Sequence, residues 1–298
     1  MGFKDEADAY MEFITERLMK SRSPDGGLPI MFTIRGETDI PELELTHLEG
    51  YKGSKPVRIG NGAAFHQQFD IYGELMDGIY LYNKYGKPVT WDQWCAVRSL
   101  LDYVLTILDQ PDMSIWEVRN NKQNFVYSKI MLWVAFDRGL RLSEKRNFPC
   151  PSRNKWLAAR DGLYEEIMVK GYNKEMKCFT QSYENTAFID SSILIAPLVF
   201  FITPNDPRFL NTMDRILLPP EKGGLTSTGL VSRYDTDMVE DGTFRRSRSN
   251  MEVGLTNMVY RRRWPRRCLQ YVHLLAGRGN DTSQCLRAQV PATGYQPV

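Results

Sequence analysis

The sequence predicts an all-α protein built from helical hairpins. Stretches with apolar residues at helical spacing alternate with loops rich in glycine, proline and polar residues, and few segments show the alternation typical of strands. Loops of similar composition recur roughly 45–90 residues apart, with a pair of helices between them. Repeated helix pairs of this kind indicate an α-toroid or an α-solenoid whose polar loops lie on one face.

The expected elements follow from local patterns along the chain. Residues 5–20 carry apolar side chains at helical spacing from Tyr10 to Leu18, and a Pro-Asp-Gly-Gly run ends that helix. Residues 28–62 are irregular, and a loop of that length is usually functional or disordered; its aromatic and apolar content argues against disorder. Thr90 is a suitable N-cap for a later helix. Helices are expected over residues 66–85, 90–109, 124–142, 152–170, 187–202 and 207–217.

Composition is that of an ordinary globular chain. The 298 residues are 42% hydrophobic and 25% charged, and no stretch reaches the roughly 18 apolar residues that a membrane span needs. The acidic N-terminus shows no secretory signal, so a cytoplasmic location is expected. Five cysteines without a Cys-x-x-Cys pair indicate neither a disulfide framework nor a zinc site. We therefore expect no metal and no membrane partner.

The net charge of +2 hides a strong asymmetry. Residues 245–298 carry ten arginines, no lysine and two acids, a net charge of +8, which leaves −6 on residues 1–244. A basic tail of this kind is able to contact nucleic acid or a membrane surface. The change of composition also predicts a boundary at residue 244.

Two glutamates in loop-like segments are candidate catalytic residues. Glu117 follows Trp116 in a loop between two expected helices, and Glu240 lies in a second loop. Two carboxylates on loops of a helical scaffold suit glycoside hydrolysis, in which one acid protonates the leaving oxygen and the other activates water or attacks the sugar. Trp116 favours the raised pKa that a general acid needs, and Arg119 either opposes this or binds hydroxyl groups. Solvated surface positions are the alternative for each glutamate.

Further polar residues suit sugar binding. Gln68 and Asp70 belong to a stretch dense in amides and carboxylates, which make the bidentate hydrogen bonds that carbohydrate hydroxyls favour. Arg233 and Tyr234 precede Glu240 closely, and an arginine and a glutamate in one loop are able to hold a sugar and a water. Helix capping and a surface ion pair of little energy are the alternatives.

Six short motifs follow one another along the chain. They occupy residues 24–31, 47–61, 68–75, 115–119, 127–131 and 231–235. In this order they resemble the catalytic domain of glycoside hydrolase family 15, the glucoamylase and trehalase-like enzymes, over residues 5–244. The resemblance implies an (α/α)6 toroid and hydrolysis of α-glucosides, oligosaccharides or trehalose, with inversion at the anomeric carbon. It implies a carbohydrate substrate as the partner and no cofactor, because two carboxylates and water suffice.

The resemblance also implies roles for the two acids. Glu117 would be the general acid, and Glu240 the base that activates water, with Asp241 as the alternative base. In an inverting enzyme the two carboxyl groups lie about 6.5–9.5 Å apart. The expected contacts with the sugar come from Trp116, Arg233, Tyr234, Gln68, Asp70 and Arg119.

The chain departs from the family pattern at both ends. The N-terminal β-domain and the first helices of the toroid are missing, so residues 1–244 are expected to form an incomplete toroid, its C-terminal portion. After Phe244 the expected hydrophobic helix is replaced by an arginine-rich stretch. We interpret residues 245–298 as a divergent basic tail from a frameshift or mis-spliced gene, in preference to a nucleic-acid-binding tail. The alternative function is an inactive fragment or a non-catalytic carbohydrate-binding toroid, and the sequence does not indicate an oligomeric state.

Overall fold

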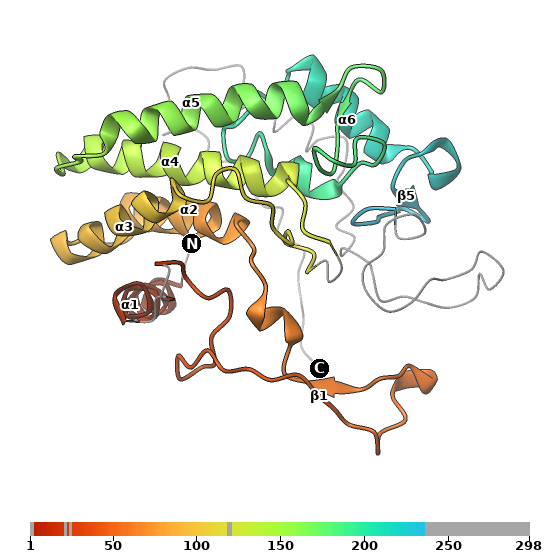
Figure 1. The fold of residues 1–298 in the computed structure, drawn as a ribbon, viewed down its shortest axis with the longest axis horizontal. Helices are drawn as coiled ribbons and strands as arrows, with labels where there is room; N and C mark the ends of the chain where they lie inside the picture. Colours follow the sequence, from red (N-terminus) through yellow and green to blue (C-terminus); the bar gives the residue numbers. More distant parts are fainter. Residues whose placement is uncertain (1–2, 21–22, 24–25, 118–120, 236–298) are drawn as a thin grey trace, which may run out of the picture.

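The structure is a computed structural model that describes residues 3–20, 23, 26–117 and 121–235 (Figure 1). Within these ranges helices dominate and each strand is only two residues long, so the all-α prediction is confirmed. The helices are α1 (Lys4–Lys20), α2 (Asp70–Tyr85), α3 (Trp91–Val104), α4 (Val126–Arg146), α5 (Arg153–Lys170) and α6 (Pro207–Leu217). The boundary predicted at residue 244 and the basic tail lie outside the described residues.

Short elements shape the loops between these helices. The 3-10 helices are η1 (Tyr51–Gly53), η2 (Gly62–Phe65), η3 (Ser191–Ile195) and η4 (Pro220–Lys222). Three antiparallel pairs join β1 (Leu43–Glu44) to β2 (Arg58–Ile59), β3 (Tyr172–Asn173) to β4 (Cys178–Phe179), and β5 (Thr226–Ser227) to β6 (Leu230–Val231). Their registers set Leu43 opposite Ile59, Tyr172 opposite Phe179 and Thr226 opposite Val231.

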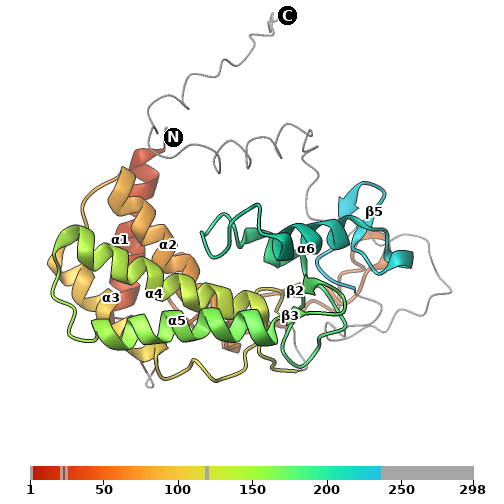
Figure 2. The ribbon, with the colours of Figure 1, turned by 90° about the horizontal axis from the view of Figure 1, so that it is seen from above.

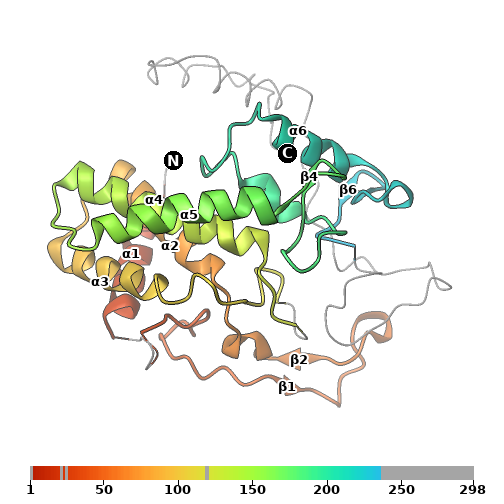
Figure 3. The ribbon, with the colours of Figure 1, turned by 45° about the horizontal axis from the view of Figure 1, so that its top comes forward.

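Helix α4 forms the centre of the core. Every residue from Val126 to Leu140 is buried, because α4 packs between α2 and α5 (Figure 2). Gly73 of α2 lies so close to α4 that a Cβ atom there would be 2.0 Å from the carbonyl oxygen of Met131. Gly73 lies beside Met131 and Asp77 beside Arg138, so α2 and α4 run parallel. The short link after α4 returns the chain antiparallel as α5 (Figure 3).

Helix boundaries follow local chemistry. Thr90 caps α3 as predicted: its hydroxyl accepts from the Gln93 N–H, and the Gln93 side chain accepts from the Thr90 N–H at 2.9 Å. The helix predicted from residue 66 begins only at Asp70, because the preceding Phe69 N–H donates to the Asp112 carboxylate at 2.8 Å. That bond holds the chain outside the helix until Asp70.

The helix predicted over residues 187–202 is wrong. The chain instead forms η3 followed by turns. Asp190 starts η3 by accepting from the Ser192 N–H at 2.8 Å. Pro197 has no N–H for a helical bond, and Phe200 adopts a φ of 63°, in the left-handed region. The apolar side chains of this segment pack into the core around α4, which explains its composition.

The irregular segment 28–62 is confirmed as a long connection that follows one side of the helices (Figure 1). The β1–β2 pair folds it back on itself. Asn61 then begins η2, and its side-chain oxygen accepts from the Ala63 N–H at 2.9 Å. Through this turn Asn61 lies against the loop that follows α3.

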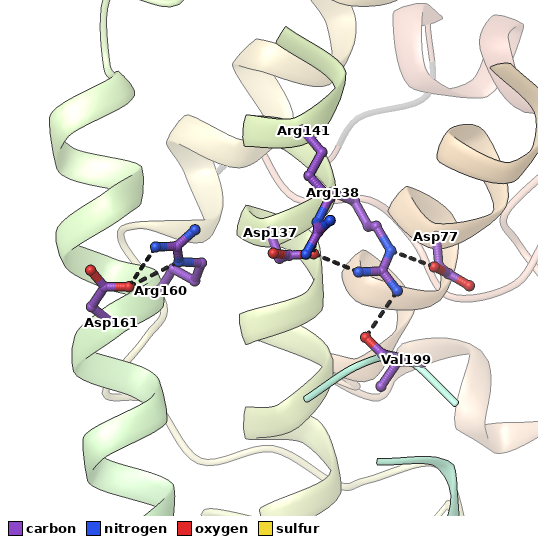
Figure 4. A network of polar contacts seen from close by, with 7 residues as sticks. All are labelled: Asp77, Asp137, Arg138, Arg141, Arg160, Asp161 and Val199. Atoms are coloured by element: carbon purple, nitrogen blue, oxygen red, sulfur yellow. Dashed lines mark hydrogen bonds and ion pairs between the residues drawn. The ribbon is translucent and has the colours of Figure 1, made fainter. Parts of the chain in front are cut away.

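A buried arginine joins three parts of the core (Figure 4). Arg138 on α4 donates to Asp77 of α2 at 2.6 Å, to Asp137 at 2.5 Å and to the carbonyl of Val199 at 2.9 Å. Its side chain is 2% exposed. Arg141 donates to the same Asp137 oxygen, Oδ2, at 2.7 Å. Because the guanidinium has this full set of acceptors, its burial is tolerated.

Replacing this arginine is expected to destabilise the fold. Arg138→Met leaves Asp77 and the Val199 carbonyl without their donor, and removing one partner of a buried pair costs about 3 kcal/mol or more. The matched control is Arg160→Met, whose pair with Asp161 is more exposed and is worth less than about 1 kcal/mol. Urea unfolding of both variants checks this; equal losses would contradict it.

The loop between α3 and α4 is anchored by a buried carboxylate. Asp112 accepts from the Phe69 N–H at 2.8 Å and from the Ser128 hydroxyl at 2.7 Å. It also exchanges both backbone hydrogen bonds with Gln123, at 2.9 and 3.0 Å, which closes the base of the loop. Burial raises the pKa of Asp112 to about 6, although these donors oppose the shift. Burial therefore makes protonation of Asp112 easier in the folded chain than in the unfolded chain.

This raised pKa predicts a pH-dependent stability. A folded pKa of about 6 against an ordinary 3.8 means that the native chain binds the proton more tightly, so the contribution of Asp112 falls by about 3 kcal/mol as pH rises from 4 to above 6. Asp112→Asn removes this dependence. Urea unfolding across this range measures the difference between variant and wild type, and parallel curves would contradict it.

A second carboxylate, that of Asp206, predicts a pH dependence of stability with the opposite sign. Hydrogen bonds from Arg208 lower the pKa of Asp206, so its contribution is present above its unfolded pKa and is lost as pH falls. Asp206→Asn should therefore lose stability mainly at the higher pH values.

Candidate active site

Glu117 lies in the closed loop between α3 and α4. It is half-buried, and its N–H donates to the Ser114 carbonyl at 3.3 Å. Its φ of 57° falls in the left-handed region, as does the φ of 59° at Ser114. Such a conformation costs a non-glycine residue about 1 kcal/mol or more, and it persists where surrounding contacts enforce it, often at functional sites. The backbone strain marks this loop as a candidate site.

The carboxylate of Glu117 is held by Asn61. The Asn61 amide nitrogen donates to both carboxylate oxygens, at 3.3 and 3.4 Å. Because the Asn61 oxygen caps η2, the amide is oriented with its nitrogen toward Glu117. This neutral donor fixes the position of the carboxylate without placing a positive charge against it.

Trp116 is fixed by a buried acid. Its indole N–H lies 3.0 and 3.1 Å from the two carboxylate oxygens of Asp190. Asp190 is 2% exposed and also accepts from the Ser192 hydroxyl at 2.6 Å and from Gln181 at 3.3 Å. Burial raises the pKa of Asp190, and these hydrogen bonds oppose the rise. The indole ring therefore has one defined orientation.

Arg233 and Tyr234 lie beside this tryptophan. The Arg233 guanidinium is 5.4 Å from the ring centre of Trp116 and 5.4 Å from that of Tyr234, within the range of cation–π attraction. The Ser191 N–H donates to the Arg233 carbonyl at 2.8 Å, and the backbones of Asp190 and Tyr234 form an isolated antiparallel β-bridge. The structure thus brings Arg233 and Tyr234 to Trp116, the residue that precedes Glu117, although the two segments are far apart in the sequence.

Gln68 and Asp70 lie at the start of α2. Gln68 is 8% exposed and lines a cleft of about 310 Å³ between residues 27–30 and 64–69. Asp70 is 2% exposed, and burial together with the nearby Glu74 and Asp112 raises its pKa well above the usual range. No hydrogen bond among the described residues joins either side chain to Glu117. Their segment is joined to the loop that carries Glu117 by the hydrogen bond from the Phe69 N–H to the Asp112 carboxylate.

Three predicted site residues lie outside the described residues: Arg119, Glu240 and the alternative base Asp241. The separation of the two carboxylates therefore stays a prediction. The structure describes the chain as far as residue 235, directly after the Arg233–Tyr234 pair.

Two residues of the site were not singled out from the sequence. Asn61 was part of a polar stretch but had no role, since its contact with Glu117 spans 56 positions. Asp190 was hidden in the apolar stretch interpreted as a helix. The Asp-Ser-Ser run was the available signal, because aspartate followed by serine is typical of a cap.

In the described part of the chain, no three His, Cys, Asp or Glu side chains gather as metal ligands would. Among the same residues, no helix combines the length and the hydropathy needed to cross a membrane.

Relatives of known sequence support one family. The model of the glycosyl hydrolases family 15 matches residues 1–263. Trehalase of Mycobacterium tuberculosis is 36% identical over 242 residues, which cover 81% of this chain and 34% of that protein. Trehalase of Thermoplasma acidophilum is 34% identical over 216 residues, 72% of this chain and 36% of that protein. The chain spans about a third of the length of these relatives.

A solved structure shares the fold. A glycosidase in complex with glucose superposes with a TM-score of 0.52 at 16% identity, covering 78% of this chain and 53% of the other. This agrees with the helical hairpins of an α/α-toroid. The family match covers most of the sequence, and the chain belongs to the glycosyl hydrolases family 15.

Proposed function

We propose that this chain carries the active site of an inverting α-glucoside hydrolase acting on trehalose or a glucose oligosaccharide. The observation that carries the proposal is the half-buried carboxylate of Glu117, held by Asn61 next to the Trp116–Arg233 pair. Trehalose is the favoured substrate because the similar proteins named above are trehalases. The partner is thus a carbohydrate.

In the proposed reaction, Glu117 donates its proton to the glycosidic oxygen as the bond to the anomeric carbon breaks. Glu240 takes a proton from a water molecule, whose oxygen attacks that carbon from the opposite face. The leaving sugar gains the proton of Glu117, and the new hydroxyl comes from water, so atoms and charges balance without a cofactor.

The same loops provide sugar contacts. Trp116 offers a flat apolar face to the sugar ring, and Arg233 offers donors in a fixed fork that matches neighbouring hydroxyls. Asn61 keeps Glu117 within reach of the leaving oxygen. Gln68, which lines the cleft, would contact more distant hydroxyls. Asp70 and Tyr234 were expected to contact the sugar too, but both are buried; Tyr234 would instead support Arg233, whose guanidinium lies over its ring.

Loss of the proposed acid is expected to reduce hydrolysis strongly. Glu117→Gln keeps the shape and the contact with Asn61 but has no proton to donate, so glucose release from trehalose should fall about 10²- to 10⁴-fold. The control is Glu165→Gln, on the exposed surface of α5, which should match the wild type. Coupled detection of glucose measures both; unchanged activity in Glu117→Gln would contradict the assignment.

The base is tested in the same assay. Glu240→Gln should lose activity to a similar extent, whereas Asp241→Asn should retain most of it. The reverse pattern would make Asp241 the base. Binding of trehalose by calorimetry without any release of glucose would favour the non-catalytic carbohydrate-binding alternative.

A further inference from the structure

The adjacent residues Asp190 and Ser191 lie between the two loops of the proposed site. We propose that Asp190 is a positioning residue, which holds the Trp116 indole and, through it, the neighbouring Glu117 in the arrangement needed for proton transfer. This inference rests on the proposed function. Asp190 itself is not expected to touch the sugar, since it is buried behind Trp116.

The contacts of Asp190 require a carboxylate. One oxygen accepts from the Trp116 indole at 3.0 Å and from both the N–H and the hydroxyl of Ser192, at 2.8 and 2.6 Å. The other accepts from Trp116 at 3.1 Å and from the Gln181 amide at 3.3 Å. An ionised carboxylate accepts at both oxygens, whereas an asparagine turns a donor toward one set of these groups. Asparagine therefore leaves at least one donor facing another donor.

The backbone of the same segment fixes the position of Arg233 and Tyr234. The Ser191 N–H donates to the Arg233 carbonyl at 2.8 Å, and Asp190 forms a bridge with Tyr234. The Arg233 guanidinium then lies over the Trp116 ring. The side chain of Asp190 and the backbone at positions 190 and 191 thus connect the loop of the proposed general acid to the segment that carries Arg233. Displacement of this segment would shift both.

The fold contains a matched control for this contact. The Trp156 indole on α5 donates to Asp102 on α3 at 3.0 Å, and Trp156 is fully buried. This is the same pairing of indole and carboxylate, within the helical core. Asp102→Asn therefore perturbs one indole contact without touching the loops of the site.

The experiment compares Asp190→Asn with Asp102→Asn. Nitrogen-15 NMR of the indole N–H groups reports each contact, with the Trp116 signal assigned through Trp116→Phe, and trehalose hydrolysis gives kcat and KM. We expect Asp190→Asn to move the Trp116 signal and speed its hydrogen exchange. It should lower kcat about 10- to 100-fold, because small misplacements of reacting groups have effects of this size. The effect on KM should be smaller.

The control should show the opposite pattern. Asp102→Asn should move only the Trp156 signal and lower the melting temperature while kcat stays at the wild-type value. Two milder variants, Ser192→Ala and Gln181→Met, each remove one donor to Asp190. They replace Asp190→Asn in the experiment if that variant does not fold. They should move the Trp116 signal in the same direction by less.

Distinct results separate this inference from the proposed function. If the Trp116 signal and kcat are unchanged in Asp190→Asn, or if neither milder variant moves the signal when Asp190→Asn is unfolded, the positioning role is wrong. If the wild-type chain releases no glucose from trehalose or maltose, the proposed function fails. The indole signals then still decide whether Asp190 orients Trp116.

Discussion

The described structure depends on the burial of α4 from Val126 to Leu140. A helix that is buried on every side must be covered by its neighbours, and α2 and α5 do so along most of its length. The close approach of α2 requires glycine at position 73. Burial also forces each polar residue of α4 to find partners within the protein. Two of those partners, Asp112 and the Val199 carbonyl, belong to the segments that lead to the candidate site.

Two positions along α4 therefore contribute to the geometry of the site. Near its start, Ser128 binds Asp112, which closes the loop that carries Glu117. Farther along, Arg138 binds the Val199 carbonyl and anchors the segment that begins at Asp190. Asp190 then meets Trp116, next to Glu117. One buried helix thus sets the relative positions of two loops that lie far apart in the sequence.

The sequence predicts the features that depend on nearby residues. The Thr90 cap and the α-helices of the described residues follow from local patterns, and the loop position of Glu117 follows from the helices on either side. The errors and omissions share a different cause. Burial made the apolar stretch around Pro197 resemble a helix, and the contacts of Asn61 and Asp190 join positions 56 and 74 residues apart. Contacts over such separations leave no local pattern.

The central claim is that this scaffold presents a general acid and a water-activating base on opposite sides of a glycosidic bond. The most direct measurement is proton NMR of the anomers released from α,α-trehalose in the first minutes of the reaction, before mutarotation. Inversion predicts one β-glucose from the attacked sugar for each α-glucose that leaves, because the leaving sugar keeps its configuration. Release of α-glucose alone would show retention and would contradict the proposed roles of Glu117 and Glu240.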